Sequence, residues 1–133
     1  MNERIQSAID KKNSGAYNCA QSVACAFCDT CGVDDATMAH ITGAFGLGMG
    51  NMEGTCGALS GAAVVIGMNI HDRMQCRKAI KGVMERFKER NGAVICKELK
   101  GIGTGKVLRQ CIDCVADAAE FLNDTLEQSE KNL

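Results

Sequence analysis

The chain has 133 residues, enough for a hydrophobic core of its own, and we expect one helical redox-type domain over residues 1–133. Its 15 basic residues balance 16 acidic ones and it has only four Phe and one Tyr, so it lacks the charge and stacking groups of a nucleic-acid-binding protein. The longest apolar run, residues 56–70, is shorter than the roughly twenty residues that cross a bilayer, so we expect no membrane-spanning helix.

Two features of the composition indicate the fold class and the chemistry: the chain has no proline and nine cysteines. Without proline the usual helix breaker is missing, which favours an all-α protein. The N-terminal residues are charged and lack the apolar core of a signal peptide, so we expect a cytoplasmic protein whose thiols stay reduced. Nine thiols in such a compartment serve as metal ligands, redox groups or small core residues more often than as structural disulfides.

The hydrophobic pattern predicts a compact bundle of six or seven helices around an apolar central helix, and no strand. The expected helices cover residues 2–12, 17–31, 35–42, 57–69, 72–90, 93–99 and 107–127. The helix over 57–69 is apolar on every side, and Gly57 and Gly61 lie one turn apart on it, where a neighbouring backbone can approach closely. An apolar helix of this kind in a short chain often needs more cover than one protomer supplies, which favours a homodimer in which a second copy covers the helix.

A glycine-rich loop leads into this central helix. Residues 43–61 contain seven glycines and one cysteine, Cys56, which the loop delivers to the helix start. The unpaired N–H groups and the dipole of a helix N-terminus stabilise a thiolate and lower its pKa, so Cys56 is the strongest candidate for a catalytic or metal-binding thiol. The alternative is a cysteine packed beside glycines as a small apolar residue.

Three further cysteines lie at inward-facing or helix-terminal positions on other elements: Cys19, Cys96 and Cys111. Each alone is more often a core residue than a functional one. Together with Cys56 they give the four thiols that a tetrathiolate metal or iron–sulfur site needs.

The remaining thiols are weaker candidates. The spacing of Cys25, Cys28 and Cys31 is that of a ferredoxin cluster run, but a fourth cysteine and the proline do not follow. On a continuous helix these three sulfurs spread around the surface, so we interpret them as core or incidental thiols, with metal binding or a local disulfide as the alternative. Cys114 forms a CxxC pair with Cys111 but turns away from the apolar stripe of its helix.

The cysteine segments resemble a known family. Residues 56–61, Cys-Gly-Ala-Leu-Ser-Gly, match the Cys-Gly-Ala-x-x-Gly motif of the C-GCAxxG-C-C redox-active family. The segment 18–21, Asn-Cys-Ala-Gln, and the surroundings of Cys96 and Cys111 are similar to the other cysteine segments of that family, in the same order over about residues 15–125.

The resemblance implies an all-helical redox protein whose four family cysteines correspond to Cys19, Cys56, Cys96 and Cys111. The pattern is also similar to part of the split-Soret cytochromes, which implies an iron–sulfur centre on this cysteine set. The chain has no CxxCH, so covalent haem is not expected. It departs from the family in having Ile112 where a proline follows the last cysteine, and in carrying five further cysteines.

These observations lead to one principal hypothesis and two alternatives. The principal one is a small redox protein that uses the four-cysteine site, with Cys56 as its low-pKa thiolate. The site would serve either electron transfer through a bound iron–sulfur cluster or thiol/disulfide exchange with a redox partner. The alternatives are a non-redox module in which the same thiols hold Zn or Cu, and a helical interaction protein whose cysteines are core residues.

Overall fold

The computed structural model describes residues 2–131 and confirms the all-α class. Its elements are α1 (Glu3–Ser14), α2 (Cys19–Cys25), α3 (Cys28–Cys31), α4 (Asp35–Thr42), the irregular turn η1 (Gly48–Met52), α5 (Gly57–Asn69), α6 (Arg73–Asn91), α7 (Cys96–Lys100) and α8 (Cys111–Lys131). In this part of the chain the only β pairing is an isolated bridge between Thr55 and Ile95. No helix within it has both the length and the apolar character that crossing a membrane requires.

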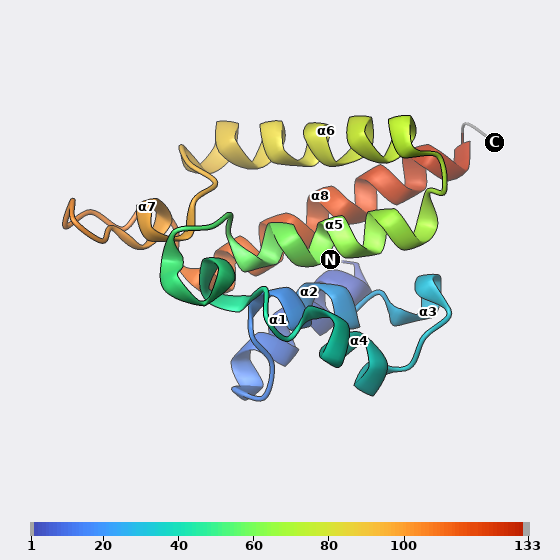
Figure 1. Ribbon diagram of the computed structural model, residues 1–133, viewed down its shortest axis with the longest axis horizontal. Helices are drawn as coiled ribbons and strands as arrows, with labels where there is room; N and C mark the ends of the chain where they lie inside the picture. The colour runs from blue at the N-terminus through green and yellow to red at the C-terminus, as the bar shows by residue number, and fades with distance from the viewer. Residues whose placement is uncertain (1, 132–133) are drawn as a thin grey trace.

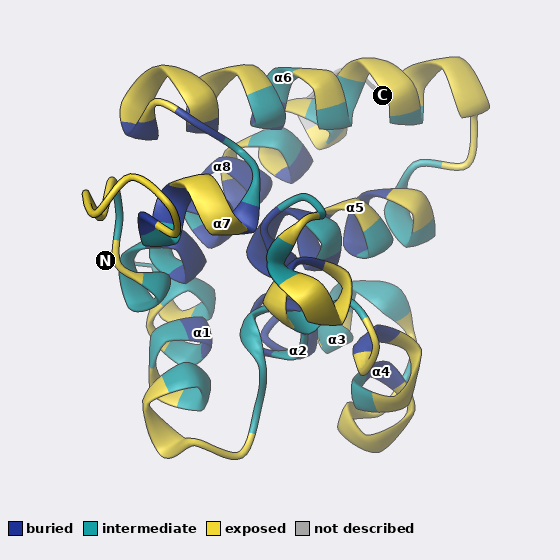
Figure 2. Cartoon of the chain, turned by 60° about the vertical axis from the view of Figure 1, so that its left-hand side comes forward, coloured by how far each residue is buried: buried dark blue, intermediate teal, exposed yellow. Residues whose placement is uncertain are grey.

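The helices pack in three layers, as Figure 1 shows. α5 and α8 lie side by side in the middle layer, α6 covers them on one side, and α1 to α4 lie on the other. Buried residues lie along α5 and α8 and on the sides of the outer helices next to them (Figure 2), and the largest buried side chains are Phe27, Phe87 and Phe121. The hydrophobic core therefore lies along α5 and α8, the two helices that the other layers cover.

The predicted central helix is α5, and its bounds agree with the prediction. Leu59, Val65 and Ile66 are at most 1% exposed, because α5 packs against α2, α6 and α8. Ala63 and Gly67 are exposed, so one side of this apolar helix faces outwards. The homodimer stays a prediction.

The close approach expected at two glycines of α5 is confirmed. A Cβ on Gly61 would overlap the carbonyl oxygen of Ala20 and lie 3.0 Å from its Cα, and a Cβ on Gly57 would lie 3.1 Å from the carbonyl oxygen of Phe45. The two glycines thus let α5 contact the backbones of α2 and of the glycine-rich loop. This contact brings the N-terminal ends of α2 and α5 together.

The prediction of one helix over residues 17–31 is wrong, because the structure has two, α2 and α3. The helix breaks at Ala26 and Phe27, where Phe27 has φ −114° and ψ 17° and its ring is completely buried. The amide of Phe27 donates to Ala24 and its carbonyl accepts from Thr30, so a tight turn replaces the regular helical hydrogen bonds. Burial of the aromatic ring outweighs the local helix propensity here.

The last two helices begin later than predicted, at Cys96 and Cys111. Ile95 is extended because it pairs with Thr55, and residues 107–110, the predicted first turn of the last helix, are bent or irregular instead of helical. Each of these helices therefore begins at a cysteine.

Candidate functional site

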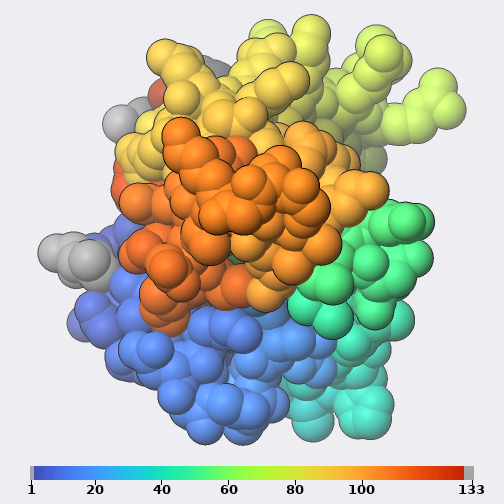
Figure 3. All heavy atoms as spheres, turned by 90° about the vertical axis from the view of Figure 1, so that its left-hand side faces the viewer, coloured from blue at the N-terminus to red at the C-terminus, as the bar shows by residue number. Residues whose placement is uncertain are grey.

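A cavity of about 240 Å³ lies at one end of the bundle and brings the predicted cysteines together. Its lining includes Cys19, Cys56, Cys96 and Cys111, and also Cys114, which the sequence analysis set aside. Figure 3 views this end, where the N-terminal segment, the glycine-rich loop and the segment that carries α7 meet. Segments far apart in the sequence thus contribute five thiols to one space.

The four predicted cysteines lie at the starts of four different helices. Cys19, Cys96 and Cys111 are the first residues of α2, α7 and α8, and Cys56 directly precedes α5. Helix starts carry backbone N–H groups without an intrahelical partner, and these groups favour a negatively charged sulfur. This effect favours thiolates at the helix starts, whereas burial raises the pKa of the Cys96 thiol.

Two backbone hydrogen bonds fix Cys56 beside Cys96. The amide of Cys56 donates to the carbonyl of Val94 over 2.7 Å, and the amide of Cys96 donates to the carbonyl of Gly54 over 3.0 Å. These bonds flank the bridge between Thr55 and Ile95, so the segments that precede α5 and α7 are held together. The main chain sets the positions of both cysteines.

Gly48 lets the glycine-rich loop pack against Cys96. It has φ +55°, and a Cβ at this position would lie only 2.5 Å from the Cβ of Cys96. Its carbonyl also accepts from the amide of Gly54 over 2.9 Å. Glycine is required here for close packing and for the left-handed backbone, which agrees with the prediction that the loop glycines bring the cysteine segments together.

Asn18 and Gln21 anchor the start of α2 and with it Cys19. The Asn18 side chain accepts from the amide of Gln21, and the Gln21 side chain accepts from the amide of Asn18, which forms a capping box. The remaining amide groups of the two side chains donate to the carbonyls of Gly43 and Ala39 over 3.1 and 3.0 Å. The Asn-Cys-Ala-Gln segment thus ties α2 to α4 and to the glycine-rich loop.

Cys111 is the most acidic thiol of the cavity. Hydrogen bonds from the Cys19 thiol and from Lys100, whose Nζ lies 3.1 Å from its sulfur, lower the pKa of Cys111 to about 5 against the opposing effect of burial. The pKa of Cys19 is raised, because its proton is held between the two sulfurs. At neutral pH we therefore describe Cys111 as a thiolate and Cys19 as the thiol that donates to it.

Cys56 forms a similar pair with Cys114. The Cys114 thiol and the amides of Ala58 and Leu59 lower the pKa of Cys56 although it is only 6% exposed, which agrees with the effect expected at a helix start. The pKa of Cys114 is raised because it is the donor of this pair. The CxxC spacing was the available signal for Cys114, but the orientation of α8 against α5 could not be deduced from it.

Three cations also line the cavity: Lys12, Lys100 and Arg109. Arg109 is held by two hydrogen bonds of 3.0 and 3.1 Å to the buried carboxylate of Asp117. Sequence spacing gave no indication of these cations, because they come from α1, α7 and the turn before α8. Their positive charge favours deprotonated sulfurs in the cavity.

A second group of ligand atoms lies outside this cavity. Cys25, Cys28 and Asp35 are the only set of three or more Cys, His, Asp or Glu residues in the described chain whose ligand atoms all lie within 4.8 Å of one another. Metal binding by the two cysteines was an alternative interpretation of their spacing, whereas Asp35 lies on another helix and had no part in that spacing. His40 and His71 are both exposed and belong to neither group.

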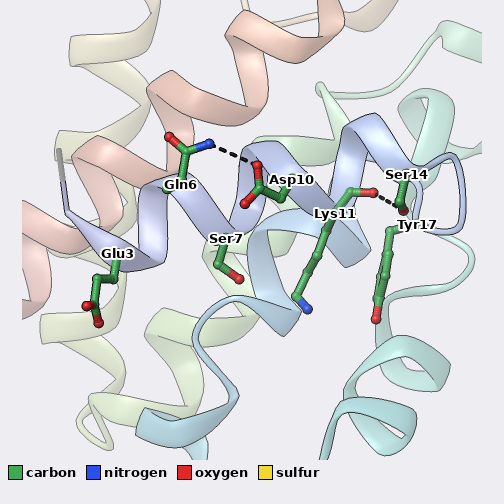
Figure 4. Close-up of a pocket in the computed structure, with 7 residues that line it drawn as sticks. All are labelled: Glu3, Gln6, Ser7, Asp10, Lys11, Ser14 and Tyr17. Carbon is green, nitrogen blue, oxygen red and sulfur yellow. Dashed lines mark hydrogen bonds between the residues drawn. The ribbon is translucent and has the colours of Figure 1, made fainter.

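A larger, open depression of about 430 Å³ lies along α1, and Figure 4 shows the side chains that line it. It contains no thiol, so the cavity at the helix starts remains the principal candidate site.

None of the curated proteins and none of the solved structures compared with this chain matches it. The family described as "Putative redox-active protein (C_GCAxxG_C_C)" matches residues 17–125, which include all five cavity cysteines. The chain therefore belongs to the C_GCAxxG_C_C family.

Proposed function

We propose that this protein transfers electrons through an iron–sulfur cluster bound by Cys19, Cys56, Cys96 and Cys111. The observation that carries the proposal is that four thiols from the starts of four helices line one cavity. Four cysteine thiolates are the usual ligands of such clusters. When bound, the cluster supplies a one-electron carrier.

The chemistry of the lining residues fits such a group. Four thiolates bring four negative charges, and Lys12 and Lys100 offset part of them, whereas the charge of Arg109 is paired with Asp117. The described lining contains no carboxylate, and Leu47 and Leu99 add apolar cover. Low solvent access and positive charge are two of the factors that set the reduction potential of a thiolate-bound centre.

The cavity thiols are less closely gathered than the ligands of a single metal ion. A tetrahedral zinc ion with Zn–S distances of 2.3 Å holds its sulfurs roughly 3.8 Å apart. Within the described chain, no three cavity thiols belong to a set whose sulfurs all lie within 4.8 Å of one another. The non-redox zinc or copper module predicted as an alternative is therefore less well supported than the cluster.

Anaerobic purification with iron and sulfide analysis tests the proposal. We expect iron, acid-labile sulfide and visible charge-transfer absorption in the native protein, and the loss of all three when a cavity ligand is replaced, as in Cys56→Ser or Cys96→Ser. Cys76→Ser is the matched control, because the Cys76 thiol lies outside the cavity and donates to the carbonyl of Ile70, as a serine hydroxyl can. A colourless protein, with or without one equivalent of zinc, would contradict the proposal.

A second candidate function, thiol/disulfide exchange, is favoured by the pairing of Cys19 with Cys111. The Cys111 thiolate attacks one sulfur of a substrate disulfide, and the other substrate sulfur leaves as a thiolate that takes a proton from water. Cys19 then loses its proton to water and attacks the Cys111 sulfur of the mixed disulfide, which releases the second substrate thiolate. The substrate gains two electrons and the Cys19–Cys111 disulfide forms. A dithiol reductant then has to reduce this disulfide to restore the two thiols.

Disulfide mapping distinguishes the two functions. After mild oxidation of the metal-free protein with diamide, thiol exchange predicts a Cys19–Cys111 disulfide. It also predicts that the reduced protein reduces a peptide disulfide and that Cys111→Ser abolishes this activity. We expect Cys31→Ser to keep this activity, because Cys31 lies outside the cavity. An iron-free protein that neither forms this disulfide nor reduces the peptide would exclude both functions.

A further inference from the structure

We propose that Cys25, Cys28 and Asp35 form a second metal site, separate from the cavity, which binds a thiophilic divalent cation such as Zn²⁺. Cys25 is the last residue of α2, Cys28 is the first residue of α3, and Asp35, the first residue of α4, completes the group. None of the three residues lines the cavity of the five thiols. The two sites therefore have separate ligands.

The geometry of the group is close to that of a bound ion. Its two sulfurs and one carboxylate oxygen all lie within 4.8 Å of one another. Ligands of a tetrahedral zinc ion lie roughly 3.8 Å apart, so shifts of about 1 Å are enough to close the group around the ion. Side-chain torsions allow shifts of this size without moving the helices.

The site can be reached from solvent. Cys25 is only 6% exposed and Cys28 is half-buried, whereas the Asp35 side chain is 50% exposed. An ion can therefore contact the carboxylate first and then the two sulfurs behind it.

Neighbouring side chains already orient the Asp35 carboxylate. One of its oxygens accepts from the Tyr17 hydroxyl over 2.9 Å, and the other lies 3.7 Å from Nζ of Lys11. In Figure 4 the Lys11 and Tyr17 side chains point the same way, away from the axis of α1. Hydrogen bonds of this kind to a ligand group fix its orientation in metal sites.

The ligand set selects the class of ion. Two thiolates and one carboxylate suit zinc and similar thiophilic ions, whereas calcium and magnesium prefer oxygen ligands alone. Three protein ligands leave the fourth tetrahedral position for water or another small ligand, whereas structural zinc sites have four protein ligands. Both thiols release their protons when the ion binds.

Titration of the full-length, reduced protein with Co²⁺, followed by displacement with Zn²⁺, tests this site. Cobalt reports thiolate ligands through charge-transfer absorption, and zinc displaces it. We expect the double variant Cys25→Ser/Cys28→Ser to bind one equivalent less than the native protein, and Asp35→Asn to bind that equivalent at least about tenfold more weakly.

Two matched controls separate ligand loss from general effects. Cys31→Ser removes a thiol of the same segment whose sulfur instead accepts from Asn69, and Asp34→Asn keeps an N-cap side chain beside Asp35. We expect both to bind as the native protein does. Circular dichroism checks folding, and the exposed position of Asp35 makes Asp35→Asn informative even where the double variant does not fold.

Three results would overturn the inference. The double variant could bind as many equivalents of Co²⁺ as the native protein, or Cys31→Ser could lose the same equivalent. The third result is a reduced native protein that binds no Co²⁺ at Cys25, Cys28 and Asp35. Iron analysis of the same variants distinguishes effects on the cavity from effects on the second site. We expect the double variant to retain its iron content and Cys56→Ser to retain the cobalt equivalent at Cys25, Cys28 and Asp35. Failure of the cluster proposal therefore leaves this test unaffected.

Discussion

The ammonium group of Lys100 lies 3.1 Å from the sulfur of Cys111, so the last residue of α7 holds a cation against the first residue of α8. The turns between the two helices make this contact: Gly101 has φ +77°, and the amide of Leu108 donates to the carbonyl of Leu99 over 2.9 Å. The chain thus folds back on α7 and delivers a thiolate to a cation that is already in place.

Replacing Lys100 is expected to make Cys111 less acidic. In the metal-free, reduced protein, Lys100→Met removes one of the two donors that lower the pKa of Cys111 to about 5. A rise of about one unit in the pKa of Cys111 lowers its thiolate fraction about fivefold at pH 5 and about twofold at pH 6, and we expect alkylation of Cys111 by iodoacetamide to slow by these factors. Mass spectrometry of the labelled peptide against pH measures this.

Lys97→Met is the control for that change, because Lys97 is an exposed residue of the same helix and does not line the cavity. A Lys100→Met profile identical to that of Lys97→Met would mean that the ammonium group does not stabilise the thiolate.

Cys114 is expected to act on Cys56 through its hydrogen bond. Cys114→Ala removes the donor that lowers the pKa of Cys56, so we expect slower alkylation of Cys56 near neutral pH. Cys114→Ser keeps a donor at the same position and is expected to restore much of the rate. Equal slowing in both variants would indicate a packing effect instead, because only the alanine variant lacks the donor.

The sequence pattern predicted those parts of the site that depend on local features. α5 and the position of Cys56 at its start follow from an apolar run that comes directly after a glycine-rich loop. The close approach at Gly61 follows from the spacing of small residues on that run. Both features involve neighbouring residues, so the sequence contains the information directly.

The missed parts depend on tertiary structure. Cys114 reaches the cavity because α8 packs against α5 and α1, and Asp35 joins Cys25 only because the buried Phe27 interrupts the helix. The pattern for a helix over residues 17–31 carries no information on Asp35, which lies on a different helix, α4. Long-range packing of an aromatic ring is not visible in local spacing.

Gly61→Ala is expected to weaken the contact between α5 and α2. Its added Cβ would overlap the Ala20 carbonyl, which is backbone and cannot move aside, so we expect a loss of about 1–3 kcal/mol in the free energy of unfolding. Gly67→Ala on the same helix meets nothing within 4 Å and is expected to gain about 0.5–1 kcal/mol. Urea denaturation measures both, and a stable Gly61→Ala variant would show that the two helices can move apart at little cost.

Asp117 is the most highly connected charged residue of the described core. Its carboxylate, with a side chain only 4% exposed, accepts hydrogen bonds from Arg90, Arg109 and Asn91. Burial alone raises the pKa of Asp117, but these three donors outweigh it and the pKa lies below its ordinary value. Folding therefore favours the ionised form.

Asp117→Asn is expected to cost about 1–3 kcal/mol of unfolding free energy at pH 7, because it removes the charge that pairs with both arginines. Because the folded pKa is the lower one, the stabilisation is fully present above the unfolded value of about 3.9 and is lost as the pH falls through the folded value. The difference in unfolding free energy between native and variant protein should thus be constant from pH 7 to about 5 and shrink below about 4, as urea denaturation at each pH measures.

The control is Asp124→Asn, which removes an exposed partner of Arg86 and should cost less than about 1 kcal/mol of unfolding free energy at every pH. A native-to-variant difference at Asp117 that persists undiminished at pH 3 would mean that shape rather than charge determines its contribution.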